Sequence, residues 1–105
     1  MAFLFYEKGS FNADIGGWDV SKLTTMESMF EEATAFNQAI GNWDVSEVTN
    51  MDVMFDEAKN FSQDLSTWCV VNVSYYGNFD TDSDLNTGQL PDWTLFGQPV
   101  TSCPA

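Results

Sequence analysis

The chain repeats itself every 25 residues, and this period constrains its fold more than any other feature of the sequence. When the sequence is shifted by 25 positions, apolar residues coincide. The coincident sets are Phe11, Phe36 and Phe61; Ile15, Ile40 and Leu65; Trp18, Trp43 and Trp68; Val20, Val45 and Val70; Met26 and Met51; Met29 and Met54; and Phe30 and Phe55. One unit of this length cannot bury its apolar face alone, so such repeats stack on one another. The match reaches back to Met1, Leu4 and Phe5, which indicates that the chain begins within a repeat.

Two structural elements are expected in each repeat. The alternation Trp18-Asp19-Val20 predicts a short strand whose Trp and Val side chains face inward. The apolar residues from Met26 to Ala33 follow at the spacing of one helix face, so residues 24–33 are predicted to form a short helix. Parallel pairing of the strands and right-handed connections between them predict an α/β solenoid, a right-handed stack of short parallel strands and short helices.

The period also predicts the domain organisation. We expect a single repeat domain over residues 1–105, which opens with a truncated half-repeat at 1–10. Repeats follow at 11–35, 36–60 and 61–79. Beyond this point the period gives way to a segment rich in Asp and Asn, so residues 80–105 are predicted to form an irregular C-terminal cap.

Two motifs carry a resemblance to a known family. W-D-V-S and M-x-x-M-F recur at fixed spacing, as in FNQAIGNWDVSEVTNMDVMFDEAKNF from Phe36 to Phe61. Over residues 1–79 the chain resembles the BspA-type leucine-rich repeats, a bacterial surface-protein repeat formerly catalogued as a domain of unknown function. The tail, with Pro91-Asp92-Trp93 and a final Cys103-Pro104, is similar to that family's terminal cap. The resemblance implies a leucine-rich-repeat-like fold and a role in adhesion, in an extracellular or cell-surface protein.

The charge balance limits the classes of partner. Three lysines, no arginine and no histidine face 16 acidic residues, which gives a net charge of −13. Phosphate backbones and anionic lipid surfaces are bound by Lys and Arg, so we expect no nucleic-acid partner. We also expect no membrane insertion, because no stretch approaches the roughly 20 apolar residues that span a bilayer. No export signal is visible, and because the resemblance implies an exported protein, we expect the chain to be part of a longer one.

Acidic residues recur one repeat apart, as in the set Glu7, Glu32 and Glu57. Such a column either forms a solvated face or binds cations or a basic partner. The segment Asp80-Thr81-Asp82-Ser83-Asp84 places oxygen ligands at alternate positions. Asp80, Asp82 and Asp84 are therefore candidate calcium ligands, and the alternative is a cap loop rich in Asx turns. No other cofactor is expected.

The composition offers few side chains suited to catalysis. There is no histidine to act as a base near neutral pH, and no histidine to activate a serine or cysteine nucleophile. We therefore expect that the protein is not an enzyme. The three repeated tryptophans are expected to pack in the core and not to form a sugar-stacking surface. Tyr75, Tyr76 and Trp93 lie outside the regular repeat and are better suited to exposed roles.

Binding of a protein partner is expected on the exposed polar positions of the predicted strands. These positions are Asp19, Ser21, Asp44 and Ser46, with Gly17 and Asn42 at the margin. The competing interpretation is a structural spacer or self-assembling element, because the repeats are nearly plain at these positions.

The two ends of the chain carry further predictions. Phe3, Leu4 and Phe5 belong to the half-repeat, which has no neighbour on its N-terminal side, so a homodimer through this end is a hypothesis. Cys69 and Cys103 are an even pair in a small chain, which is compatible with one disulfide and an oxidising compartment.

Overall fold

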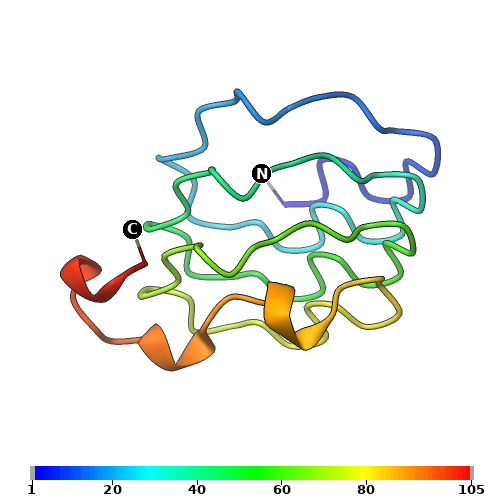
Figure 1. Ribbon diagram of the computed structural model, residues 1–105. Helices are drawn as coiled ribbons and strands as arrows, with labels where there is room; N and C mark the ends of the chain where they lie inside the picture. The colour runs from blue at the N-terminus through cyan, green and yellow to red at the C-terminus, as the bar shows by residue number, and fades with distance from the viewer. Residues whose placement is uncertain (1, 105) are drawn as a thin grey trace.

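A computed structural model describes residues 2–104 and shows a stack of irregular loops that lie side by side (Figure 1). The predicted alignment of Met1 with the repeat methionines falls outside the described residues. Within the described residues, the helices are three short 3-10 turns, all in the cap: η1 (Thr87–Gln89), η2 (Trp93–Leu95) and η3 (Val100–Ser102). Isolated parallel β-bridges pair Thr25 with Asn50 and Asn50 with Tyr75.

The predicted α/β solenoid of parallel strands and short helices is wrong. No strand or sheet forms within residues 2–104, and the segment from Trp18 to Val20 is irregular. Residues 24–33 contain turns instead of a helix. The amide of Met29 donates to the carbonyl oxygen of Met26 at 3.2 Å, and the amide of Ala33 donates to that of Phe30 at 3.0 Å.

Left-handed backbone conformations explain why the helix does not form. Ser28 and Glu32, each the third residue of a four-residue turn, have φ angles of 54° and 60°. A helix needs right-handed angles throughout, so each left-handed residue ends it. The corner residues of two consecutive turns have the same spacing as one face of a helix, and they are the residues that are buried. The apolar pattern alone therefore could not separate the two structures.

Main-chain hydrogen bonds join these turns to the next repeat. The amides of Met26, Ser28, Phe30 and Glu32 donate to the carbonyl oxygens of Asn50, Asp52, Met54 and Asp56, at 2.8–3.0 Å. The same pattern joins the following pair of repeats, from Met51 to Tyr75 onwards. Because every second amide points to the neighbouring layer, the 25-residue register is kept without a pleated sheet.

Side-chain amides hold the opposite side of each layer. The Asn12 carboxamide oxygen accepts the Asn37 amide at 2.9 Å, and the Asn37 oxygen accepts the Ser62 amide at 3.0 Å. Gln38 and Gln63 reinforce the column with bonds to the preceding asparagine. Within the described residues, no buried side-chain nitrogen or oxygen lacks a partner.

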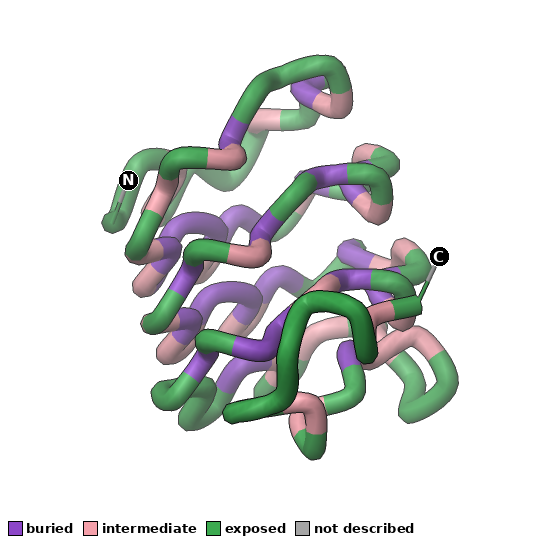
Figure 2. The backbone as a smooth tube through the Cα atoms, turned by 90° about the vertical axis from the view of Figure 1, so that its left-hand side faces the viewer, coloured by how far each residue is buried: buried purple, intermediate pink, exposed green. Residues whose placement is uncertain are grey.

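Stacked aromatic rings form the core, and Figure 2 shows the buried positions along the successive loops. The rings of Phe30 and Phe36 stack within one layer at 4.2 Å, and Phe30 meets Phe55 of the next layer at 5.3 Å. Trp43 and Trp68 are buried, as expected. Trp18 is not: 42% of its surface is exposed, because within residues 2–104 no further layer covers the outer side of the first one.

The cap closes the other end of the stack. The Trp93 ring stacks on Tyr76 at a centroid distance of 4.2 Å, and the Gly97 amide donates to the Val71 carbonyl oxygen at 2.9 Å. Cys69 and Cys103 are joined by a disulfide, which confirms the pairing that the cysteine count allowed. The bond attaches the end of the cap to the third repeat.

Candidate functional site

An acidic surface follows from the geometry of the turns. Apart from the buried Ser28, the central residues of the turns from Met26 to Ala33 and from Met51 to Ala58 face outward, while the corner residues fill the core. Many of these outward positions are acidic, and they recur in register from layer to layer. We call this surface the acidic turn face, and it comprises Glu7, Glu27, Glu31, Glu32, Asp52, Asp56, Glu57 and Asp82.

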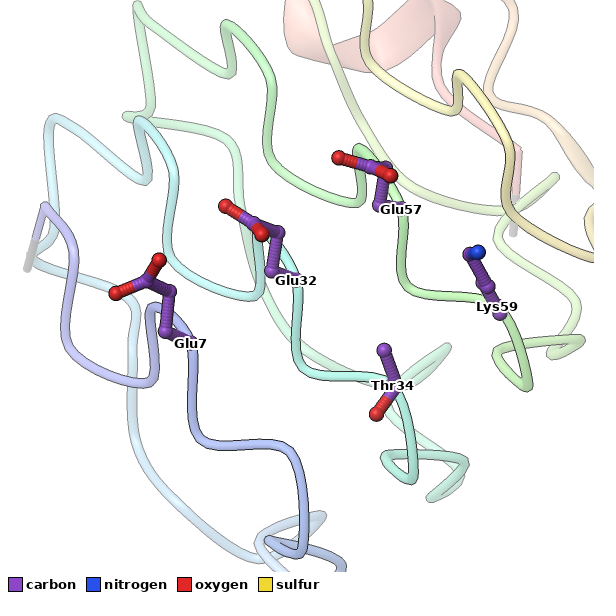
Figure 3. Close-up of a pocket in the computed structure, with 5 residues that line it drawn as sticks. All are labelled: Glu7, Glu32, Thr34, Glu57 and Lys59. Carbon is purple, nitrogen blue, oxygen red and sulfur yellow. The ribbon is translucent and has the colours of Figure 1, made fainter.

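A hollow of about 520 Å³ lies at one edge of the acidic turn face. Glu7, Glu32 and Glu57 line it from three successive layers, and Figure 3 shows their carboxylates in one row. Thr34 and Lys59 lie on the other side of the hollow. The column of glutamates expected from the repeat is therefore present, and it borders an open depression.

Two carboxylates of this face, those of Glu32 and Asp56, have a raised pKa. The pKa of Glu32 is raised by partial desolvation and by the charges of Glu7, Glu57 and Glu31, in that order. The pKa of Asp56 is raised by partial desolvation and then by Glu31, Glu57 and Asp82. A raised pKa means that the ionised form is disfavoured here, so a bound cation or cationic side chain would relieve the repulsion.

The predicted binding residues Asp19, Ser21, Asp44 and Ser46 form two local pairs. The amide and hydroxyl of Ser21 donate to Asp19 Oδ1 at 3.0 and 2.6 Å, and Ser46 donates to Asp44 in the same way. These bonds are the main cause of the lowered pKa of Asp19 and Asp44. Both carboxylates are exposed, and each closes a turn. Their role in binding a partner remains a prediction. These residues do not lie on a strand face, because no strand forms here.

The structure does not gather the candidate calcium ligands into a site. Asp82 and Asp84 are exposed, and Asp80 is half-buried. Within residues 2–104, no group of three or more Asp, Glu, Cys or His side chains could hold a metal ion. The Ser83 hydroxyl instead donates to the Asp80 carbonyl oxygen at 2.9 Å, as in the alternative of a turn-rich loop.

The predicted dimer residues differ in exposure. Phe3 and Leu4 are exposed, by 52% and 42%. Phe5 instead packs inside the chain, between Phe11 at 4.0 Å and Phe30 at 5.4 Å. Only the first two of the three are therefore available to a partner.

Sequence reasoning missed part of the acidic hollow. Thr34 and Lys59 carry no periodic signal, since the two positions lie one repeat apart but differ in residue type. Asp82 was interpreted as a calcium ligand, although it lies 25 residues after Glu57 and acts on Asp56 electrostatically. Extending the acidic column into the cap would have placed Asp82 on the acidic turn face.

Comparison with known protein families gives a match. The family model described as "Mycoplasma protein of unknown function, DUF285" matches residues 1–94. No curated protein and no solved structure matches the chain. Among the described residues, no helix has the length and hydrophobicity needed to cross a membrane.

Proposed function

The chain belongs to the DUF285 family, and we propose that it is a non-catalytic interaction module of a cell-surface or secreted protein that binds a basic protein partner. The disulfide supports the location, because such bonds persist in oxidising compartments. The BspA-type resemblance of its motifs supports the role in adhesion. The acidic turn face supports the choice of partner.

The row formed by Glu7, Glu32 and Glu57 is the observation that carries this proposal. Three carboxylates from three layers border one open hollow, and the pKa of Glu32 is raised by desolvation and by both neighbours. The layers fix the spacing of the row through main-chain hydrogen bonds, so a partner meets preorganised charges. Lys or Arg side chains that reach the row replace repulsion by attraction, and the net charge of −13 accelerates encounter with a basic surface.

The proposal is tested with a blocked deca-lysine peptide at low salt. In one variant, Glu32→Gln, Asp56→Asn and Glu57→Gln remove three charges from the acidic turn face. A matched control, Asp14→Asn, Glu47→Gln and Asp64→Asn, removes three exposed charges elsewhere. We expect about tenfold weaker peptide binding by the first variant and about twofold weaker binding by the control. Equal losses would show that net charge alone attracts the peptide and would refute the acidic turn face as a site.

A second candidate function is self-assembly, and the exposed apolar side chains of the first layer favour it. Phe3, Leu4 and Trp18 are 52%, 42% and 42% exposed. In the turns, amides donate towards the following layer, so the turn of the first layer presents carbonyl oxygens outward. Two copies that meet through this same face would bring carbonyl rows together, and only side chains would join them. Sedimentation equilibrium between micromolar and millimolar protein detects this association, and a constant monomer mass would refute it.

A further inference from the structure

A second hollow, of about 440 Å³, is lined by residues of the second and third repeats. We call it the aromatic notch, and it is lined by Asp52, Ser74, Tyr75, Tyr76 and Gly77. Its residues break the repeat pattern. Tyr75 stands where the two preceding repeats have Thr25 and Asn50, and it is 60% exposed. The stacking of the layers does not require an exposed aromatic ring at this position.

One wall of the aromatic notch is rigid. Tyr76 stands at the position of the fully buried Met26 and Met51, yet it is 41% exposed. Its ring stacks on Trp93 at an interplanar angle of 4°. Trp93 in turn packs edge-to-face against Phe79, which belongs to the core. The position of Tyr76 is therefore fixed before any ligand arrives, which lowers the entropic cost of binding.

The lining of the notch also includes an oriented carboxylate, that of Asp52. The Gly77 amide donates to Asp52 Oδ1 at 2.7 Å, and the Asp52 amide donates to Asn50 Oδ1 at 2.9 Å. A carboxylate can accept about four hydrogen bonds, so Oδ2 retains acceptor capacity. Gly77 replaces the acidic residues Glu27 and Asp52 of the preceding repeats, and a Cβ atom at this position would meet Asp52 Oδ1 at 3.4 Å. The glycine thus leaves the carboxylate uncovered.

We infer that the aromatic notch binds an arginine side chain of a basic protein segment. A guanidinium group is planar and can stack on an exposed tyrosine ring while its N–H groups donate to a carboxylate. Tyr75 and Asp52 supply these two features, and no basic residue lines the hollow. The charge of the protein favours a cationic occupant over a neutral one. The inference shares its partner chemistry with the proposed function but rests on a site distinct from the Glu7, Glu32 and Glu57 row.

The test uses a blocked tetra-arginine peptide and follows the amide resonance of Gly77 by NMR, because this amide is bonded to Asp52. We expect the peptide to shift the resonances of Gly77 and Tyr76. Asp52→Asn should weaken binding about fivefold and Tyr75→Ala about threefold, whereas Tyr75→Phe should bind as the native chain does. Asp14→Asn is the matched control, since Asp14 Oδ1 also accepts an amide, that of Gly16 at 3.0 Å, and we expect less than a twofold change.

Three outcomes would overturn the inference. The first is peptide binding that neither Asp52→Asn nor Tyr75→Ala weakens, and the second is an equal loss from Asp14→Asn. The third is a shift of the Gly77 resonance by maltotriose and not by the peptide, which would assign the notch to neutral sugars. If binding survives the notch variants but falls with Glu32→Gln and Glu57→Gln, the proposed function stands without the notch. If binding falls with the notch variants but survives Glu32→Gln and Glu57→Gln, the inference about the notch stands and the proposed role of the acidic row is refuted.

Discussion

The indole Nε1–H of Trp68 donates a hydrogen bond of 3.0 Å to the carbonyl oxygen of Ile40, 28 residues earlier in the chain. Trp43 makes the same bond to Ile15 at 3.2 Å. Each buried tryptophan therefore adds a second hydrogen bond to a main-chain acceptor of the preceding layer while its ring fills the core. The recurring tryptophan thus has a polar role as well as an apolar one, and it fixes the register of adjacent layers.

Replacing Trp68 with Phe should therefore destabilise the fold by about 2–4 kcal/mol. The substitution removes one of the two hydrogen bonds that the Ile40 carbonyl oxygen accepts, leaving the one from the Trp43 amide at 3.1 Å, and it opens a cavity beside Phe55. Urea unfolding measures the change. Trp18→Phe is the control, and we expect it to cost less than about 1 kcal/mol because the Trp18 side chain is already 42% exposed. Similar costs for the two variants would refute the role of the interlayer bond.

Close approach of adjacent layers makes a second prediction. A Cβ atom at Gly41 would lie far inside van der Waals contact with the Asp64 carbonyl oxygen of the next layer, which belongs to rigid backbone. Gly41→Ala should cost about 1–3 kcal/mol. Gly17→Ala is the matched control, because a Cβ atom there meets nothing within 4 Å. We expect that control to be neutral or to stabilise the protein by up to about 1 kcal/mol in the same urea experiment.

Backbone strain at Val53 makes a third prediction. Val53 has a φ angle of 51°, a conformation that β-branched residues rarely adopt. The equivalent residue of the next repeat is Asn78, also at 51°, and asparagine tolerates this region. Val53→Asn should therefore raise the free energy of unfolding by about 1 kcal/mol, and Asn78→Val should lower it by a similar amount. Two changes of the same sign would show that packing, and not backbone conformation, decides these positions.

The sequence predicted the period and the register because both depend on residue identity at fixed spacing, and its even pair of cysteines was compatible with the disulfide. It did not predict the local structure. The positions of Met26, Met29, Phe30 and Ala33 fit one helix face as well as the corners of two turns. Only the left-handed φ angles at Ser28 and Glu32 distinguish the two turns from a helix, and neither serine nor glutamate is a residue type that predicts such angles. Helix periodicity thus gave the correct buried residues within the wrong element.

The candidate site could be predicted only where it follows from the 25-residue period. The column of Glu7, Glu32 and Glu57 follows from the period alone, so the acidic row could be predicted. The aromatic notch could not, because it depends on the cap residue Trp93 packing against Tyr76. The cap has no period, and contacts between it and the repeats are tertiary.

The disulfide makes a fourth prediction. Cys69 and Cys103 are 34 residues apart, and closing a loop of this size stabilises a fold by roughly 3–4 kcal/mol on the chain-entropy model. Adding a reductant should therefore lower the melting temperature markedly, and Cys69→Ser with Cys103→Ser should reproduce that loss without reductant. A count of two free thiols in the unreduced, denatured protein would contradict the bond.

Glu32 and Asp44 should respond to pH with opposite signs. The pKa of Glu32 is raised in the fold by desolvation and by Glu7, Glu57 and Glu31. Its stabilising contribution is therefore present below the unfolded pKa and is lost as pH rises through the folded pKa. The pKa of Asp44 is lowered, chiefly by the Ser46 hydroxyl, so its contribution is present above the unfolded pKa and is lost as pH falls through the folded pKa.

Thermal unfolding of Glu32→Gln and Asp44→Asn between pH 3 and 7 checks these signs. At pH 7, Glu32→Gln should raise the melting temperature, and the gain should shrink towards pH 3 and in high salt, because salt screens the neighbouring carboxylates. Asp44→Asn should lower the melting temperature at pH 7, and this loss should also shrink towards pH 3. If Glu32→Gln instead lowers the melting temperature at pH 7, the carboxylates of the acidic turn face do not repel one another. The proposed binding of a basic partner would then lack its electrostatic basis.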